Sequence, residues 1–172
     1  MRAEEAIEKR VSVRKFSERS LSASDLKKII DAGRLAATAN NIQPVEFIIV
    51  QDKDRRKKMS ALAPKNGPYM EYAPAVIAVI SQPETYYLED GSASTQNILV
   101  MARALGIGSV WIAGDKKDYA PEILRLLGAP ADYRLVSLVC LGYPEKDFPT
   151  TPKKHPSEVR HWEMYGVSEE EV

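Results

Sequence analysis

Four cationic residues surround a hydroxyl group in the stretch KRVSVRKF, residues 9–16. In an extended segment, alternate side chains point to opposite sides, so Arg10, Ser12 and Arg14 would share one side. Guanidinium groups offer forked donors, and two of them beside a hydroxyl suit a phosphate dianion better than a single carboxylate. The alternative is a solvated basic edge, because short basic runs are common. This basic segment is the first candidate for a binding site.

A second set of polar residues lies in the stretch AATANNIQPVEF, residues 36–47. Asparagine and glutamine side chains both donate and accept hydrogen bonds, so Asn41 and Gln43, beside Thr38, could read the edge of a heterocycle. The alternative is a helix end closed by an asparagine in the left-handed conformation before a strand begins. A third candidate is the tail PKKHP, residues 152–156, where Lys153 and Lys154 could add cationic contacts or only keep an exposed segment soluble.

Composition excludes several other kinds of site. The 172 residues contain 24 Lys plus Arg and 24 Asp plus Glu, so no global field favours nucleic acid or an acidic membrane surface. The single cysteine, Cys140, lies in an apolar run and is predicted to be a packed core thiol. Together with two histidines it offers no zinc spacing, so no metal site is predicted. A charged N-terminal start, with no apolar run of roughly 20 residues, indicates a cytoplasmic protein.

The elements that would position these groups can be read from hydrophobic periodicity. Helices are predicted at 3–9, with Ala6 and Ile7 inward, and within 21–39, where Ser22 and Asp25 form a variant of the capping box. Further helices are expected at 54–62, 92–108 and 121–128, and strands at 45–51, 75–81, 109–114 and 133–144. This order of elements predicts one domain of mixed α and β structure. A doubly wound sheet is conceivable, but the sequence has no GxGxxG and no GxxxxGK[ST] loop.

The predicted helix at 92–108 is apolar on nearly every side, which is typical of a buried helix. A chain of 172 residues has few other elements that could cover such a helix on every side. The tail from Phe148 onward looks extended and has no core of its own, so it is expected to lie on another surface. Both features favour a large obligate dimer interface.

In this order, the motifs resemble those of the flavin-dependent nitroreductase family. KRVSVRKF resembles the family's R-x-S-x-R/K signature, and AATANNIQPVEF resembles its P-S-x-x-N-x-Q-P-W segment. DGSASTQNILVMARALGIGSVWIAG is similar to its long central helix and glycine turn, and LGYPEK and PKKHPSEVRHW to its closing strand and basic C-terminal motif. The similarity runs from about residue 5 to residue 163. Departures are Ala37, Thr38, Asn40 and Val45, where the family often has proline, serine, glycine and tryptophan.

The resemblance implies an α+β fold: a three-layer α-β-α sandwich with a mixed, mainly antiparallel sheet and a long buried central helix. It also implies a homodimer with FMN at the interface and a tail, about 148–172, extended onto the partner subunit. The residues it assigns to the cofactor are Arg10, Ser12 and Arg14 at the phosphate and ribityl chain; Thr38, Ala39, Asn41 and Gln43 from the partner; and Lys153 or Lys154 at the phosphate. The backbone N–H groups of Ala113 and Gly114 would face the flavin N5.

The activity implied by the resemblance is hydride transfer from NADH or NADPH through FMN to a nitroaromatic, quinone or similar acceptor, with ping-pong kinetics. Such chemistry needs little acid–base machinery from the protein, and no catalytic side chain is assigned. Tyr69, Met70 and Tyr72 could form a small lid or belong to the core. Two alternatives stay open. One is a family member specialised for dehalogenation or flavin conversion, and the other is a flavin-binding module without turnover.

Overall fold

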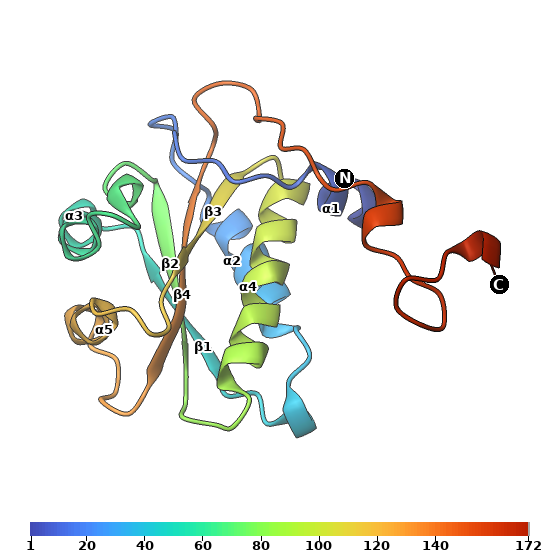
Figure 1. The fold of residues 1–172 in the computed structure, drawn as a ribbon. Helices are drawn as coiled ribbons and strands as arrows, with labels where there is room; N and C mark the ends of the chain where they lie inside the picture. The colour runs from blue at the N-terminus through green and yellow to red at the C-terminus, as the bar shows by residue number, and fades with distance from the viewer. Residues whose placement is uncertain (172) are drawn as a thin grey trace.

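The computed structural model describes residues 1–171 and contains a four-stranded antiparallel sheet (Figure 1). The strands lie in the order β1-β2-β4-β3. Their bounds are Val45–Val50 for β1, Ala75–Ser81 for β2, Gly108–Ala113 for β3 and Arg134–Gly142 for β4. Antiparallel pairing excludes a doubly wound parallel sheet. In the described chain, parallel pairing is limited to one bridge between Ser12 and Ser109, so the predicted mixed, mainly antiparallel α+β sheet is confirmed.

Helices cover both faces of the sheet, which makes the predicted three-layer sandwich (Figure 1). α2 and α4 lie on one face, and α3 and α5 lie on the other. The helices are α1 Ala3–Lys9, α2 Ala23–Arg34, α3 Lys53–Leu62, α4 Tyr87–Ala104 and α5 Ala120–Leu127, with short 3-10 turns at Ala39–Asn41, Pro68–Met70, Pro156–Glu158 and Glu169–Glu171. Within residues 1–171, none of the helices has both the length and the apolar character needed to cross a membrane.

Alternation along β2 explains why both faces are covered. Every residue of this central strand is buried, and successive side chains point to opposite faces. Ala75, Ile77 and Val79 pack in the cluster that faces α2 and α4. Val76, Ala78 and Ile80 pack in the cluster that faces α3 and α5. The strand is therefore apolar throughout because it separates two cores.

Local signals set the helix ends. Ser22 caps α2 by accepting a hydrogen bond from the Asp25 backbone N–H at 3.0 Å, which confirms the predicted cap. Asp52 caps α3 in the same way through the Arg55 N–H at 2.8 Å. At its other end α2 stops at Arg34, so Ala37 lies outside the helix, although a helix was predicted within residues 21–39. Ile7 is also wrong as an inward residue, because its side chain is 60% exposed.

The long helix α4 is buried on one side only. It begins at Tyr87, earlier than predicted, and its buried residues include Thr95, Ile98 and Ala102. Glu89, Ala93 and Gln96 are exposed and lie on the opposite side. In the single chain, the sheet and α2 cover one side of α4, and the predicted cover of its other side by a partner subunit stays a prediction. We call the residues Glu89, Ala93, Gln96 and Val100 the open stripe of α4.

Gly91 lets α4 approach the sheet closely. A Cβ atom at this position would lie 2.6 Å from Val136 Cγ2, far inside normal contact. We expect Gly91→Ala to lower the free energy of unfolding by about 1 to 3 kcal/mol, the usual cost of overpacking. Urea denaturation measures the change. Val136→Ala should recover part of the loss when combined with Gly91→Ala, and strictly additive losses would show that this contact is not the cause.

Cys140 is a core thiol, as predicted, and its side chain is fully buried in β4. Burial raises the pKa of the Cys140 thiol strongly, although the nearby Arg56 charge acts in the opposite direction. In the unfolded chain the thiol titrates near its ordinary pKa of about 8.5, so above that pH the unfolded state binds fewer protons than the folded state.

The stability contributed by this neutral thiol should be complete below about pH 8.5 and fall by about 1.4 kcal/mol per pH unit above it. Urea denaturation between about pH 8 and about pH 9.5 measures the slope. Cys140→Ala is the control, since it should lose stability overall but show a flatter dependence on pH. Equal slopes for the two proteins would contradict the assignment.

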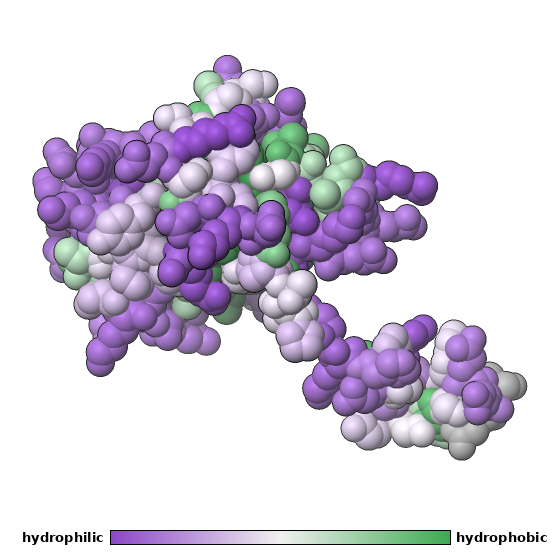
Figure 2. Space-filling model, turned by 90° about the horizontal axis from the view of Figure 1, so that it is seen from above, coloured by the Kyte–Doolittle hydropathy of each residue, from purple (hydrophilic) through white to green (hydrophobic). Residues whose placement is uncertain are grey.

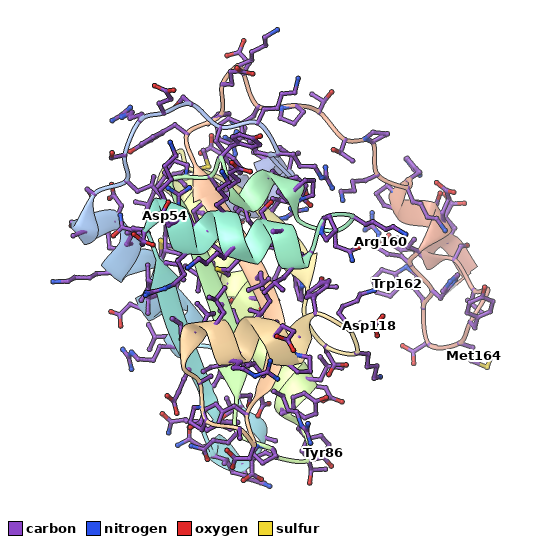
Figure 3. The ribbon with its side chains drawn as sticks, turned by 90° about the vertical axis from the view of Figure 1, so that its left-hand side faces the viewer. Asp54, Tyr86, Asp118, Arg160, Trp162 and Met164 are labelled. Atoms are coloured by element: carbon purple, nitrogen blue, oxygen red, sulfur yellow. The ribbon has the colours of Figure 1, made fainter. Side chains whose placement is uncertain are left out.

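The C-terminal tail leaves the sandwich and extends past α1 (Figure 1), forming a separate projection in the view from above (Figure 2). Arg160, Trp162 and Met164 belong to this arm, with Met164 at its outer end (Figure 3). Nearly all of residues 149–170 are exposed, including the large apolar side chains of Trp162, Met164 and Tyr165. The tail is thus extended and has no core of its own, as predicted. That it lies on a partner subunit stays a prediction.

Candidate functional site

The basic segment runs along the outer edge of β3. The Val13 backbone N–H donates to the Ser109 carbonyl at 2.9 Å, and the Val13 side chain is only 2% exposed. Arg14 and Lys15, which follow, are exposed. Val13 therefore packs on the sheet and Arg14 faces outward, as expected for an extended segment, although Lys15 is exposed as well.

The cations of this segment have no acidic partners. In the described chain, Arg10, Arg14 and Lys15 take part in no ion pair, whereas Lys9 is paired with Glu5 at 2.6 Å. A cavity of about 240 Å³ is lined by Arg14 and Lys15, but not by Arg10. Its polar lining consists of Ser12, Arg14, Lys15, Lys146, Glu145 and Asp147. Unpaired guanidinium and ammonium groups around a hydroxyl are available to hold an anion. Lys146 was not predicted.

Ala113 presents a backbone N–H at the other end of the same edge. Gly114 donates its own N–H to the Val136 carbonyl at 3.2 Å. In an antiparallel pair, hydrogen-bonded and non-hydrogen-bonded residues alternate, so the Ala113 N–H and carbonyl point away from β4. The Tyr119 hydroxyl donates to this carbonyl. Of the two predicted donors, Ala113 therefore has the N–H directed at the open edge, while the Gly114 N–H is used inside the sheet.

The distance between the basic segment and the Ala113 N–H limits which molecules could bind along the edge of β3. Ser12 lies beside Ser109, and Ala113 is four residues further along β3. At about 3.3 Å per residue, the anion-binding end and the Ala113 N–H are about 13 Å apart. A molecule with a phosphate at one end, a polar ring at the other and a flexible chain between them fits this arrangement. This cavity is smaller than the roughly 300 to 1,000 Å³ of most cofactor pockets, and Arg14 and Lys15 also line a neighbouring cavity of about 1050 Å³.

The amide-rich segment lies elsewhere in the same chain. Ala39 donates its backbone N–H to Asp90 Oδ1 at 3.0 Å, which anchors the segment at the N-terminal end of α4. The basic segment lies beside Ser109, beyond the C-terminal end of α4. At 1.5 Å per residue, the intervening length of helix is about 20 Å. One chain thus does not bring these two predicted groups together, and their meeting across two subunits stays a prediction.

The backbone of this segment is unusual. Asn40, Asn41 and Gln43 have φ angles of 51°, 55° and 57°, in the left-handed region. Gln43 donates its N–H to Thr38 Oγ1 at 3.1 Å, and its side-chain amide donates to the Asn41 carbonyl at 3.3 Å. The asparagines are left-handed, as the alternative interpretation required, but they follow α2 at a distance and do not close it. The conformation exposes Asn41 and Gln43 to solvent.

The two lysines of the tail are exposed and distant from any bonding partner in the chain. Neither Lys153 nor Lys154 makes a hydrogen bond or ion pair with a described residue. The start of the tail does lie at the basic segment, because Pro149 and Ser12 line the same cavity. The structure therefore places the origin of the tail at the site and leaves the lysines on the projecting arm.

The fold and this edge site define a recognised class of protein. Two overlapping segments, residues 7–88 and 64–143, match the model of the Nitroreductase family, so the chain belongs to that family. A protein of Archaeoglobus fulgidus, provisionally named NADH dehydrogenase/NAD(P)H nitroreductase, is 43% identical over 148 residues, covering 81% of this chain and 84% of that protein.

Two further proteins that are similar to this chain have names that refer to flavin or FMN. The NADPH-flavin oxidoreductase of Vibrio harveyi is 26% identical over 171 residues, which are 90% of this chain and 70% of that protein. The structure of an FMN-dependent nitroreductase from Clostridium difficile superposes with a TM-score of 0.84 at 25% identity, covering 93% of this chain and 98% of that one.

Proposed function

We propose that the protein is an FMN-dependent NAD(P)H oxidoreductase that reduces nitroaromatic or quinone acceptors. Its cofactors are FMN and NADH or NADPH. The observation that carries the proposal is the edge of β3, where unpaired Arg10, Arg14 and Lys15 lie at one end and the outward Ala113 N–H lies at the other. The relatives named for nitroreductase and flavin oxidoreductase activity support it.

Each part of the edge has a role suited to its chemistry. When bound, FMN supplies the redox chemistry, taking a hydride from the nicotinamide and passing electrons to the acceptor. Arg10 and Arg14 hold the phosphate with forked donors, and Ser12 donates its hydroxyl nearby. The Ala113 N–H donates to the N5 side of the ring. Because donor and acceptor use the same open face in turn, the kinetics are ping-pong.

The active form is a homodimer in this proposal. One chain leaves open three surfaces that a second copy would cover: the open stripe of α4, the exposed segment with Asn41 and Gln43, and the projecting tail. The partner supplies Thr38, Ala39, Asn41 and Gln43 to the ring, and the tail brings Lys153 or Lys154 to the phosphate. The partner's residues would thus enlarge the cavity of about 240 Å³ that Ser12 and Arg14 line in one chain.

The visible absorption spectrum of the purified protein tests the proposal, recorded anaerobically before and after addition of NADH or NADPH. We expect the two-banded spectrum of a bound flavin, bleached by at least one donor, with the colour restored by a nitroaromatic or quinone. A flavin that is bound but never bleached would indicate a binding module without turnover. A colourless protein that takes up no added FMN would refute the flavin site.

A further inference from the structure

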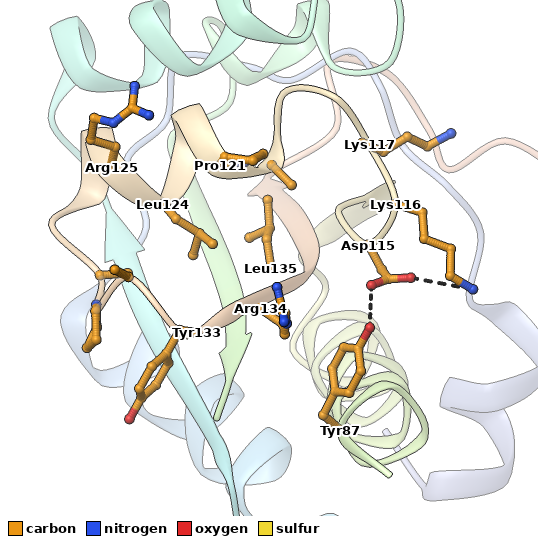
Figure 4. A pocket seen from close by; sticks show the side chains of 14 residues that line it. Tyr87, Asp115, Lys116, Lys117, Pro121, Leu124, Arg125, Tyr133, Arg134 and Leu135 are labelled. Carbon is orange, nitrogen blue, oxygen red and sulfur yellow. Dashed lines mark hydrogen bonds and ion pairs between the residues drawn. The ribbon is translucent and has the colours of Figure 1, made fainter. Parts of the chain in front are cut away.

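A second cavity, outside the edge site, lies between α5, the start of β4 and the loop after β3 (Figure 4). Its volume is about 670 Å³, within the range of small-molecule sites. We call it the α5 groove. Its lining includes two tyrosines, an apolar floor from α5 and β4, and a set of charged residues. The members that matter here are Tyr87, Asp115, Lys116, Lys117, Tyr133 and Arg134.

The α5 groove has an excess of positive charge, although the chain as a whole has none. Four of its lining residues are cationic and one, Asp115, is acidic. Glu122 neutralises Arg125 through contacts of 2.6 and 2.7 Å. Lys116 lies 3.9 Å from Asp115, whereas Lys117 and Arg134 form no ion pair in the described chain. Phosphate oxygens are the natural partners of such a group.

Asp115 is held in a fixed orientation. The Tyr87 hydroxyl donates to Asp115 Oδ1 at 2.6 Å, which leaves Oδ2 facing Lys116 (Figure 4). This hydrogen bond, together with burial, raises the pKa of Tyr87, so the phenol stays a donor. An oriented carboxylate oxygen can accept hydrogen bonds from sugar hydroxyls, as acidic residues do in nucleotide sites.

The walls of the groove suit a planar ring. Tyr133 lies on one side of Arg134 and Tyr87 on the other in the view of Figure 4. The Tyr133 hydroxyl is bonded to Glu46, which fixes this wall. Pro121, Leu124 and Leu135 add apolar surface. Aromatic and apolar side chains of this kind bind heterocyclic bases by stacking and burial.

The position of the groove connects it to the edge site. Asp115 is the second residue after Ala113, and the Ala113 N–H lies at the end of the edge where the flavin ring is proposed to bind. A donor whose nicotinamide lies at Ala113 can therefore extend its other half directly over Asp115. The phosphate-binding end of the edge, at Ser12, is the more distant one.

We infer that the α5 groove binds the adenosine-phosphate half of the nicotinamide dinucleotide. Arg134, with Lys116 and Lys117, holds the phosphates; Asp115 accepts from the ribose hydroxyls; and Tyr133, with the apolar surface of Leu124, lies against the adenine. This inference rests on the proposed use of NADH or NADPH, and it gives the donor a site of its own beside the flavin.

Calorimetric titration of the FMN-loaded protein with adenosine 5′-monophosphate tests the groove without any turnover. We expect binding that Arg134→Gln weakens about tenfold and that the exposed α3 substitution Arg55→Gln, which removes the same charge, leaves unchanged. Lys116→Gln serves as a second variant should Arg134→Gln fold poorly. Absence of binding, or equal binding to all variants, would overturn the inference.

Kinetics provide an independent readout. The ratio of kcat/KM for NADH to that for 1-benzyl-1,4-dihydronicotinamide, a donor without any nucleotide, should fall about tenfold in Arg134→Gln, through KM. An unchanged ratio for both NADH and NADPH counts against the groove, even where the flavin is bleached normally. A protein that binds adenosine monophosphate in the groove but is bleached by no donor would refute the proposed function and keep the groove as a nucleotide site.

Discussion

Replacing Arg14 by alanine is expected to weaken FMN binding by about tenfold or more. Arg14 is exposed on the outer side of the basic segment, lines the cavity with Ser12 and has no acidic partner in the described chain. A hydrogen bond to a charged group contributes about 1.5 to 3 kcal/mol, and 1.4 kcal/mol corresponds to a factor of ten. Because solvent screens an exposed charge, we expect the lower part of that range.

Fluorescence titration of the apoprotein with FMN measures this loss of affinity. Arg14→Lys keeps the charge but removes the forked donors, so its affinity should lie between those of the wild type and Arg14→Ala. Arg55→Ala is the matched control on α3, and it should bind FMN normally. The same argument applies to Arg10→Ala. Unchanged affinity in both alanine variants would mean that the basic segment is only a solvated edge.

Replacing Ala93 by arginine is expected to dissociate the proposed dimer and release its flavin. Ala93 is exposed in the open stripe of α4. In an isolated chain a surface substitution of this kind changes stability by less than about 0.5 kcal/mol. In an interface, an unpaired buried charge costs several kcal/mol, and breaking a buried ion pair costs about 3 to 5 kcal/mol. A loss of this size raises the dissociation constant of a dimer by more than about a hundredfold. The effect expected if Ala93 lies in an interface is therefore much larger than the effect expected if it lies on a free surface.

Sedimentation velocity, with absorbance read at the flavin band, measures assembly and cofactor content together. Ala61→Arg on α3, which is equally exposed but lies on the other face of the sheet, is the control and should remain a flavin-loaded dimer. A dimeric, flavin-loaded Ala93→Arg protein would show that the open stripe is not the interface. A wild-type protein that is a folded monomer would refute the dimer altogether.

Most of the architecture could be predicted because its signals are local. β2 separates two cores, so its unbroken apolar run identifies it without tertiary information. Ser22 caps α2 through a residue three positions away, which a sequence pattern can show. How much of α4 is covered could not be predicted, because periodicity reports how apolar a helix is and not which surfaces pack against it.

The candidate site could be predicted only where its residues are near neighbours in sequence. Arg10, Ser12 and Arg14 form a pattern within one short segment, and the outward position of Arg14 follows from strand alternation. Tyr87 and Asp115 are far apart in the chain and meet only because α4 and the loop after β3 converge. No short sequence pattern predicts a contact between residues that are so far apart in the chain. The use of the Gly114 N–H inside the sheet likewise depends on pairing with Val136, a residue far away in the sequence.

The edge of β3 has a further consequence for the handling of this protein. The basic segment pairs with β3 at Ser12 and Val13, which leaves the strand's outer N–H and carbonyl groups largely unpaired as far as Ala113. Trp111, on the same strand, is 37% exposed. An unpaired strand edge with an exposed aromatic side chain is a template for association with other chains. A ligand lying along this edge would therefore also act as a shield against aggregation, so the flavin-free protein should be the harder form to keep in solution.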